Sequence, residues 1–169
     1  MQNKKYISPL IVGFAAGVFS IVPVLKSLGC CLLIPLAAYI ALLLDQKANS
    51  DFSKLEIKKG VVFGLITGLS AAIFGTVFDS LITLITHKND LIAAFPQLLE
   101  TINNFPIDEA TKQEVLSLLN NVIESIKASG YSSLYTFSLL ANNLFANSVF
   151  GMLGGIIGVQ ILNSRNQAK

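Results

Sequence analysis

The sequence predicts an all-α integral membrane protein of four transmembrane helices, with an extracytoplasmic amphipathic helical hairpin between the third and the fourth. Apolar residues make up 53% of the 169 residues and charged residues only 13%, which is more apolar surface than a soluble core of this size requires. A helix needs ~20 mostly apolar residues to cross a hydrocarbon layer ~30 Å thick, and four segments come near that length. We therefore expect residues 1–169 to form a single membrane domain.

The first two expected spans, residues 7–25 and 28–44, carry no charged residue, and the second stops at Asp45. Because the second is short, we expect it either to cross untilted or to pair with the first as a tight hairpin. A cleaved signal peptide is the competing interpretation of the first span, because a signal peptide also joins a basic start to an apolar run. A second apolar run follows directly, which favours a retained span. We expect Cys30 and Cys31 to serve as small apolar residues in a helix, and the alternatives are lipidation or an intermolecular disulfide.

The third and fourth expected spans, residues 60–85 and 134–162, are longer than a bilayer requires. The third contains one charged residue, Asp79, and the fourth contains none and ends shortly before Arg165. Because of their length, we expect both helices to tilt or to project into water.

The segment between them, residues 89–130, has apolar residues at a helical spacing of three or four, which predicts two amphipathic helices. The two stripes are Leu91, Phe95, Leu98, Ile102 and Phe105, then Val115, Leu118, Leu119, Val122 and Ile126. The expected caps and breaks are Asn89 or Asp90 and a kink or restart at Pro96 in the first helix, then Asp108 and Gly130 in the second. We expect an antiparallel hairpin that lies over the outer face of the bundle or on the lipid headgroups.

The cations predict the orientation, because Lys and Arg in short loops resist translocation. With the N-terminus inside, the cytoplasmic segments hold Lys4, Lys5, Lys47, Lys54, Lys58, Lys59, Arg165 and Lys169, and the outer segments hold Lys26, Lys88, Lys112 and Lys127. This excess predicts that both termini are cytoplasmic. The net charge of +2 offers no basic patch of the kind that nucleic acid requires, so we expect no nucleic-acid partner.

Glycines at four-residue spacing predict close helix packing, because helices in lipid gain from close backbone approach rather than from water exclusion. The candidate packing residues are Gly60, Gly64 and Gly68 in the third span and Gly151, Gly155 and Gly158 in the fourth. We expect these two helices to pack together inside the monomer. Dimerisation through the glycines of the fourth span is the alternative.

A carboxylate inside an apolar span is a functional candidate, because a charge is costly there. Asp79 shares a helix face with Thr83, and less well with His87, while Asn143 and Asn147 lie one turn apart on the fourth span. Structural pairing of Asp79 with an asparagine amide is the favoured interpretation. Two alternatives remain: a cation or proton site at Asp79 with His87 as a neighbouring proton exchanger, and simple exposure of Asp79 at the membrane surface.

Motifs of enzymes do not occur in this sequence. One histidine and two adjacent cysteines do not suffice for the usual zinc sites, and no H-E-x-x-H, nucleophile elbow, Walker loop or dinucleotide fingerprint is present. We expect a protein that is not an enzyme and binds no cofactor. Its expected partners are the lipid bilayer and either a second copy of the chain or another membrane protein.

The last two thirds of the chain combine Lys58-Lys59-Gly60-Val61-Val62-Phe63-Gly64-Leu65, an acidic amphipathic insert, Asn143-Leu144-Phe145 and Gly154-Gly155-Ile156-Ile157-Gly158. This layout resembles an uncharacterised family of small four-helix bacterial inner-membrane proteins. The resemblance implies a bacterial inner (plasma) membrane location and supplies no catalytic or binding residues. A structural or protein-interaction role is the leading expectation, and a small transporter or channel component using Asp79 and the facing asparagines is the alternative.

Overall fold

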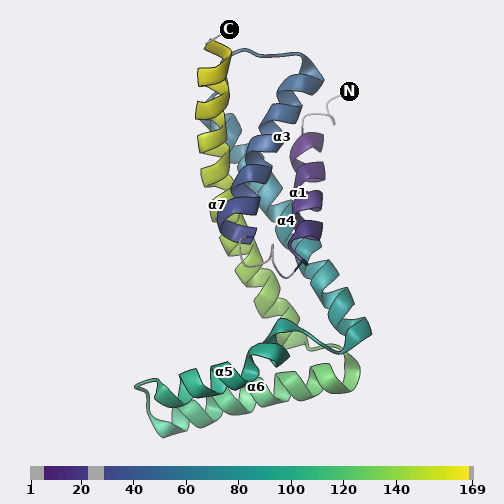
Figure 1. Cartoon of the computed structure of the whole chain (residues 1–169), viewed down its shortest axis with the longest axis vertical. Helices are drawn as coiled ribbons and strands as arrows, with labels where there is room; N and C mark the ends of the chain where they lie inside the picture. Colours follow the sequence, from purple (N-terminus) through teal and green to yellow (C-terminus); the bar gives the residue numbers. More distant parts are fainter. Residues whose placement is uncertain (1–5, 23–28, 168–169) are drawn as a thin grey trace. The chain divides into compact units, whose positions relative to one another are not determined.

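The computed structural model describes residues 6–22 and 29–167 (Figure 1). These residues form six α-helices and one π-helical segment, which confirms the all-α class. In chain order they are α1 (Ile7–Phe19), η1 (Gly29–Leu33), α3 (Ile34–Asn49), α4 (Ile57–Thr86), α5 (Asp90–Asn104), α6 (Glu109–Ser129) and α7 (Ser133–Gln167). The chain divides into two compact units, the first being Met1–Phe78 with Leu139–Lys169 and the second Asp79–Ser138.

Three helices of the described chain are long and apolar enough to cross a membrane: Cys31–Asn49, Ile57–Thr86 and Ser133–Gln167. The prediction of four spans is not confirmed, because α1 has only 13 residues and is about 20 Å long at 1.5 Å per residue. The helix ends where the Ser20 hydroxyl donates to the Ala16 carbonyl over 2.8 Å. Val22 also precedes a proline, and such a residue is disfavoured from helical backbone angles. Residues 23–25 of the expected span, and the turn that follows it, lie outside the described residues.

The second span does not stop at Asp45 as expected. Helix α3 continues through Asp45 to Asn49 and ends at Ser50, whose left-handed backbone (φ 48°) terminates the helix. Asp45 is 3% exposed and Gln46 is 1% exposed. The charge does not end the helix because it is neutralised inside the fold, by an ion pair described below.

Helices α4 and α7 meet through their glycines in the first unit. A Cβ atom at Gly60 would lie 2.5 Å from the Gly155 carbonyl oxygen, and one at Gly64 would collide with the Gly151 carbonyl. A Cβ at Gly68 would collide with the Asn147 carbonyl. Backbone therefore packs on backbone along three successive turns, as small residues permit in membrane helices.

Other glycines allow α1 and α3 to pack closely against α4 and α7. A Cβ at Gly13 of α1 would lie 2.5 Å from the Thr67 carbonyl oxygen of α4. An adjoining strip of α7 receives α3, where a Cβ at Gly154 would collide with Pro35 and one at Gly158 would lie 3.2 Å from the Tyr39 Cα. The glycines of the fourth predicted span are thus occupied by α3 and α4 of the same chain.

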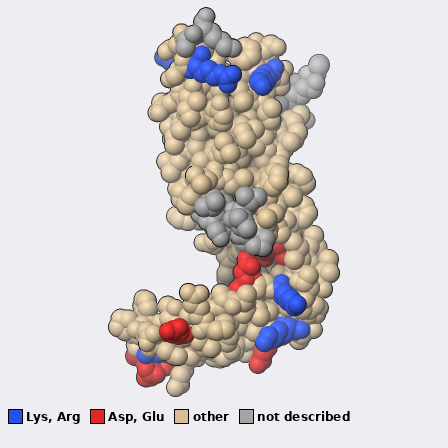
Figure 2. All heavy atoms as spheres, in the orientation of Figure 1, with Lys and Arg blue, Asp and Glu red and all other residues tan. Residues whose placement is uncertain are grey.

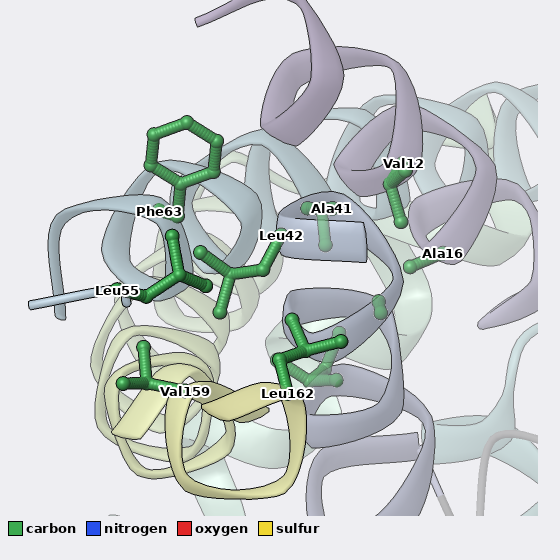
Figure 3. Close-up of a cluster of buried hydrophobic side chains, with 11 residues drawn as sticks. Val12, Ala16, Ala41, Leu42, Leu55, Phe63, Val159 and Leu162 are labelled. Atoms are coloured by element: carbon green, nitrogen blue, oxygen red, sulfur yellow. The ribbon is translucent and has the colours of Figure 1, made fainter. Parts of the chain in front are cut away.

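Glycine and alanine lie at the closest helix contacts of the first unit, Phe63, Leu42 and Leu162 are buried beside them, and many large apolar side chains lie on its outside. Ala37, Ala38 and Ala41 of α3 are at most 4% exposed, and Ala37 and Ala41 join a cluster that draws on α1, α3, α4 and α7 (Figure 3). Ile11 of α1 is 59% exposed and Leu32 is 61% exposed. Such exposure of large apolar side chains suits a bundle whose surroundings are as apolar as its core.

The second unit contains α5 and α6, which run side by side in opposite directions (Figure 1). Asn89 caps α5 by accepting from the Ile92 N–H over 3.0 Å, and Asp108 caps α6 by accepting from the Thr111 N–H over 2.9 Å. Hydrogen bonds from Thr111 hold the pKa of the Asp108 carboxyl below its usual value. The expected caps are confirmed, and α6 ends at Gly130 in the left-handed region (φ 71°), also as expected.

Pro96 lies inside α5, so the helix does not restart there. Helix α5 has no buried residue, whereas Val122, Ile123 and Ile126 of α6 are buried. The apolar stripe of α6 is therefore covered near its C-terminal end, while Leu118 remains 50% exposed.

Candidate functional site

Asp79 lies in the second unit, in the C-terminal part of α4, and accepts a hydrogen bond from a residue that the sequence did not single out. The Tyr135 hydroxyl donates to Asp79 Oδ2 over 3.2 Å. Both side chains are half-buried. A phenol proton directed at the carboxylate stabilises its charge.

The expected asparagines lie elsewhere. In the first unit the Asn143 amide donates to the Thr76 hydroxyl over 3.0 Å, and Thr76 is only 3% exposed. Asn147 contributes its backbone to the contact with Gly68, and its side chain is half-buried. The interhelical hydrogen bond of Asn143 is therefore made to a threonine hydroxyl.

Thr83 and His87 occupy different surroundings. Thr83 is 4% exposed, whereas His87 is exposed and has a left-handed backbone (φ 54°) just after α4 ends. Its Nδ1 lies 3.1 Å from the Lys127 carbonyl oxygen of α6, a spacing at which a protonated Nδ1 donates a hydrogen bond. His87 thus ties the end of α4 to α6.

A second polar cluster, at the far end of the first unit, went unnoticed in the sequence. Lys59 Nζ lies 2.7 Å from Asp45 Oδ2, and the side chain of Asp45 is only 5% exposed against 32% for Lys59. The ammonium also lies 5.5 Å from the centroid of the Phe63 ring, within the range of a cation–π contact. This ion pair joins the end of α3 to the start of α4.

The loop between α3 and α4 is held against the end of α7. Asn163 accepts from the Leu55 N–H over 2.8 Å and donates to the Leu55 carbonyl over 3.0 Å. One turn later, Asn166 donates to the Phe52 carbonyl over 3.1 Å. The two amides satisfy loop backbone groups that no helix or sheet pairs.

No family model, curated protein or solved structure matches this chain. The resemblance drawn from the sequence pattern stays a prediction, and the arguments that follow depend on the geometry alone. Among the described residues, no three His, Cys, Asp or Glu side chains lie together as a metal site would require.

A signal for the second cluster was available in the sequence. Asp45 and Gln46 continue the spacing of the buried alanines and Leu42 of α3, at positions 37, 38, 41 and 42. Residues at that spacing share one helix face, so the pattern places both polar side chains toward the core. No comparable signal selects Tyr135, because an aromatic residue in an apolar run has no special spacing.

Proposed function

We propose that this protein is a multi-pass membrane protein with a structural or protein-interaction role. The observation that carries the membrane part is the packing of the first unit, with glycine and alanine at the closest helix contacts and many large apolar side chains outside. A soluble protein rarely exposes so much contiguous apolar surface. The long helices also fit: the first-unit part of α4, residues 57–78, is about 33 Å long, close to the ~30 Å of a hydrocarbon core.

The orientation we propose has both termini in the cytoplasm, in a bacterial inner membrane, with the α5–α6 hairpin outside and the first apolar segment as a fourth, short crossing. Figure 2 shows Lys and Arg side chains gathered at one end of the first unit, where α3 and α7 end and α4 begins. The described cations on these segments are Lys47, Lys54, Lys58, Lys59 and Arg165. Such a concentration favours the cytoplasmic side for this end.

Single cysteines test this orientation. In a background with Cys30 and Cys31 replaced by alanine, we expect Ser117→Cys to react with a membrane-impermeant maleimide in intact bacterial cells and Ser53→Cys to react only after lysis. Both serines are exposed. Leu153→Cys is the control, because Leu153 is 48% exposed on the apolar surface of α7 and lipid would shield it. Reaction of Ser53→Cys in intact cells would invert the proposed orientation.

The interaction role is supported by the hairpin of the second unit. It carries six acidic residues against three lysines over residues 88–133, yet Leu118 of α6 and Phe105 beside the turn are 50% and 58% exposed. An exposed leucine on a polar helix is where a partner helix would contact it. Asp79, in contrast, is held by Tyr135, which favours a structural role for that carboxylate.

The two roles predict opposite results for two substitutions. We expect Leu118→Asn to lower the yield of a photo-crosslinked adduct, formed through a benzophenone side chain at Ser117, at least fivefold. Asp79→Asn should leave that yield unchanged, since an asparagine oxygen still accepts from Tyr135. Leu119 is less suited to the test, because it is already half-buried.

A flux measurement tests the transport interpretation. Purified protein is reconstituted in vesicles, and dyes report the proton and potassium fluxes. We expect neither variant to change these fluxes. If Asp79→Asn abolished a flux while Leu118→Asn left the adduct intact, the transport interpretation would replace the interaction role.

A further inference from the structure

A pocket of about 390 Å³ opens in the first unit, where α3 and α7 end. Its polar lining consists of Gln46 and Lys47 from α3 and Arg165 and Asn166 from α7. All four residues are within the last turns of their helices. The pocket is separate from the one beside Tyr6, which the acidic residues Asp51 and Glu56 line.

Gln46 is the residue that indicates a ligand. It is 1% exposed, and its Nε2 has no hydrogen-bond partner within the described chain. Leaving such a buried donor unpaired lowers stability, because its hydration is lost and no hydrogen bond replaces it. A single water molecule would satisfy the amide but would occupy only ~30 Å³, so most of the pocket is left for a larger acceptor group.

The two cations of the pocket are also available. Among the residues that the structure describes, neither Lys47 nor Arg165 forms an ion pair, whereas Lys59 is engaged by Asp45. Arginine presents a planar fork of donors that matches phosphate and carboxylate oxygens in two parallel hydrogen bonds. A group with several anionic oxygens therefore fits the donors of this pocket.

The helix ends do not cancel this attraction. A helix C-terminus carries partial negative charge on its free carbonyls, and both α3 and α7 end here. At α3, however, the Gln46 carbonyl already accepts from the Asp51 N–H over 3.1 Å, and the Lys47 carbonyl accepts from the Ser50 N–H over 3.3 Å. With these carbonyls bonded, two full positive charges dominate the pocket.

The remaining wall is apolar and suits a lipid. Leu43, Phe52 and Leu162 complete the lining, and Phe52 is 55% exposed. Basic pockets between the ends of membrane helices on the cytoplasmic side bind anionic lipid headgroups. A phospholipid would place its phosphate on the cations and the start of its chains on this wall.

We propose that this pocket binds a phosphate group, with the Gln46 amide, Lys47 and Arg165 as its donors. The phosphate is carried by an anionic phospholipid of the same membrane or arrives as a free anion. The lipid source rests on the proposed membrane role, while recognition of phosphate by these donors does not.

Thermal unfolding of the full-length protein in detergent tests the proposal. The probes are short-chain phosphatidylglycerol, short-chain phosphatidylcholine and inorganic phosphate, each titrated separately. We expect phosphatidylglycerol to raise the unfolding temperature in a saturable manner, with a smaller effect of phosphatidylcholine. Saturation by inorganic phosphate alone would assign the pocket to a free anion, and no saturable effect of any probe would overturn the proposal.

Variants separate the pocket from general charge effects. Arg165→Gln should weaken phosphatidylglycerol binding about tenfold, and Lys47→Gln should weaken it severalfold. Lys58→Gln is the matched control, because Lys58 is exposed at the same end of the unit but does not line this pocket. Equal losses in Lys58→Gln and Arg165→Gln would mean that surface charge alone attracts the lipid, and the pocket would have no role.

Gln46→Leu distinguishes a binding residue from a structural one. It should weaken binding severalfold while leaving the unfolding temperature without ligand unchanged or higher, because it removes an unpaired buried donor. A lower unfolding temperature with unchanged binding would instead show that Gln46 serves the fold. Since cysteine labelling in cells reports the orientation independently, failure of lipid binding and failure of the proposed membrane role give different results.

Discussion

Gly64→Ala is expected to destabilise the protein by about 2–3 kcal/mol, although it adds a single methyl group. The added Cβ would collide with the carbonyl of Gly151, and that carbonyl belongs to a helix backbone that no rotamer change can move. Helices α4 and α7 would have to separate along the whole glycine contact. The dispersion energy of backbone packing, on which membrane helix association depends, would then be lost.

Gly75→Ala is the matched control for this experiment. It lies on the same helix, and its added Cβ would be 3.6 Å from the Gly17 carbonyl oxygen, an ordinary contact distance. We expect it to leave stability unchanged or to raise it by up to about 1 kcal/mol through helix propensity. Unfolding by sodium dodecyl sulfate in mixed micelles measures both variants. If the two alanines behaved alike, close packing at Gly64 would be refuted.

Lys59→Met is expected to cost about 3 kcal/mol, because it leaves the buried carboxylate of Asp45 without its counter-ion. Methionine keeps a long apolar side chain at this position, so the loss reports the charge of Lys59, in its ion pair and in its cation–π contact with Phe63. Asp45→Asn should cost less, about 1 kcal/mol, since Lys59 is already a third exposed and its ammonium can turn to water. The order of the two effects reflects the difference in burial of the two partners.

A double variant completes this test. Asp45→Leu combined with Lys59→Met removes both charges and should recover most of the stability lost in Lys59→Met, as replacement of a buried ion pair by apolar groups often does. Lys58→Met serves as the control for loss of an exposed lysine. Additive losses in the double variant would show that the two side chains do not stabilise each other.

The Asp79–Tyr135 hydrogen bond and the Asp45–Lys59 ion pair both bear on the proposed role. Asp79 accepts a hydrogen bond from Tyr135 within the second unit, whereas Asp45 and Lys59 join the end of α3 to the start of α4 in the first unit. Neither carboxylate is a bare charge inside the bundle. In both arrangements the polar groups hold the fold, and the hairpin and the pocket lined by Lys47 and Arg165 are the surfaces that we propose bind other molecules.

The sequence predicted where helices form better than it predicted which side chains contact one another. The all-α class, the caps at Asn89 and Asp108, and the end of α6 at Gly130 followed from local rules, because a cap depends only on residues within one turn. The uncharged run stops at Asp45, but the helix continues to Asn49, because a charge ends an apolar run in composition without ending the helix.

By itself, the sequence determined an all-α chain of long apolar helices, with glycine spacings that permit close contact and an acidic amphipathic insert. Only the tertiary structure decided that α1 ends at Phe19, that Tyr135 donates to Asp79, and that Lys59 neutralises Asp45. The physical reason is that periodicity identifies which face of a helix is buried. The groups that lie opposite that face come from distant parts of the chain, and their choice depends on how all the helices pack at once.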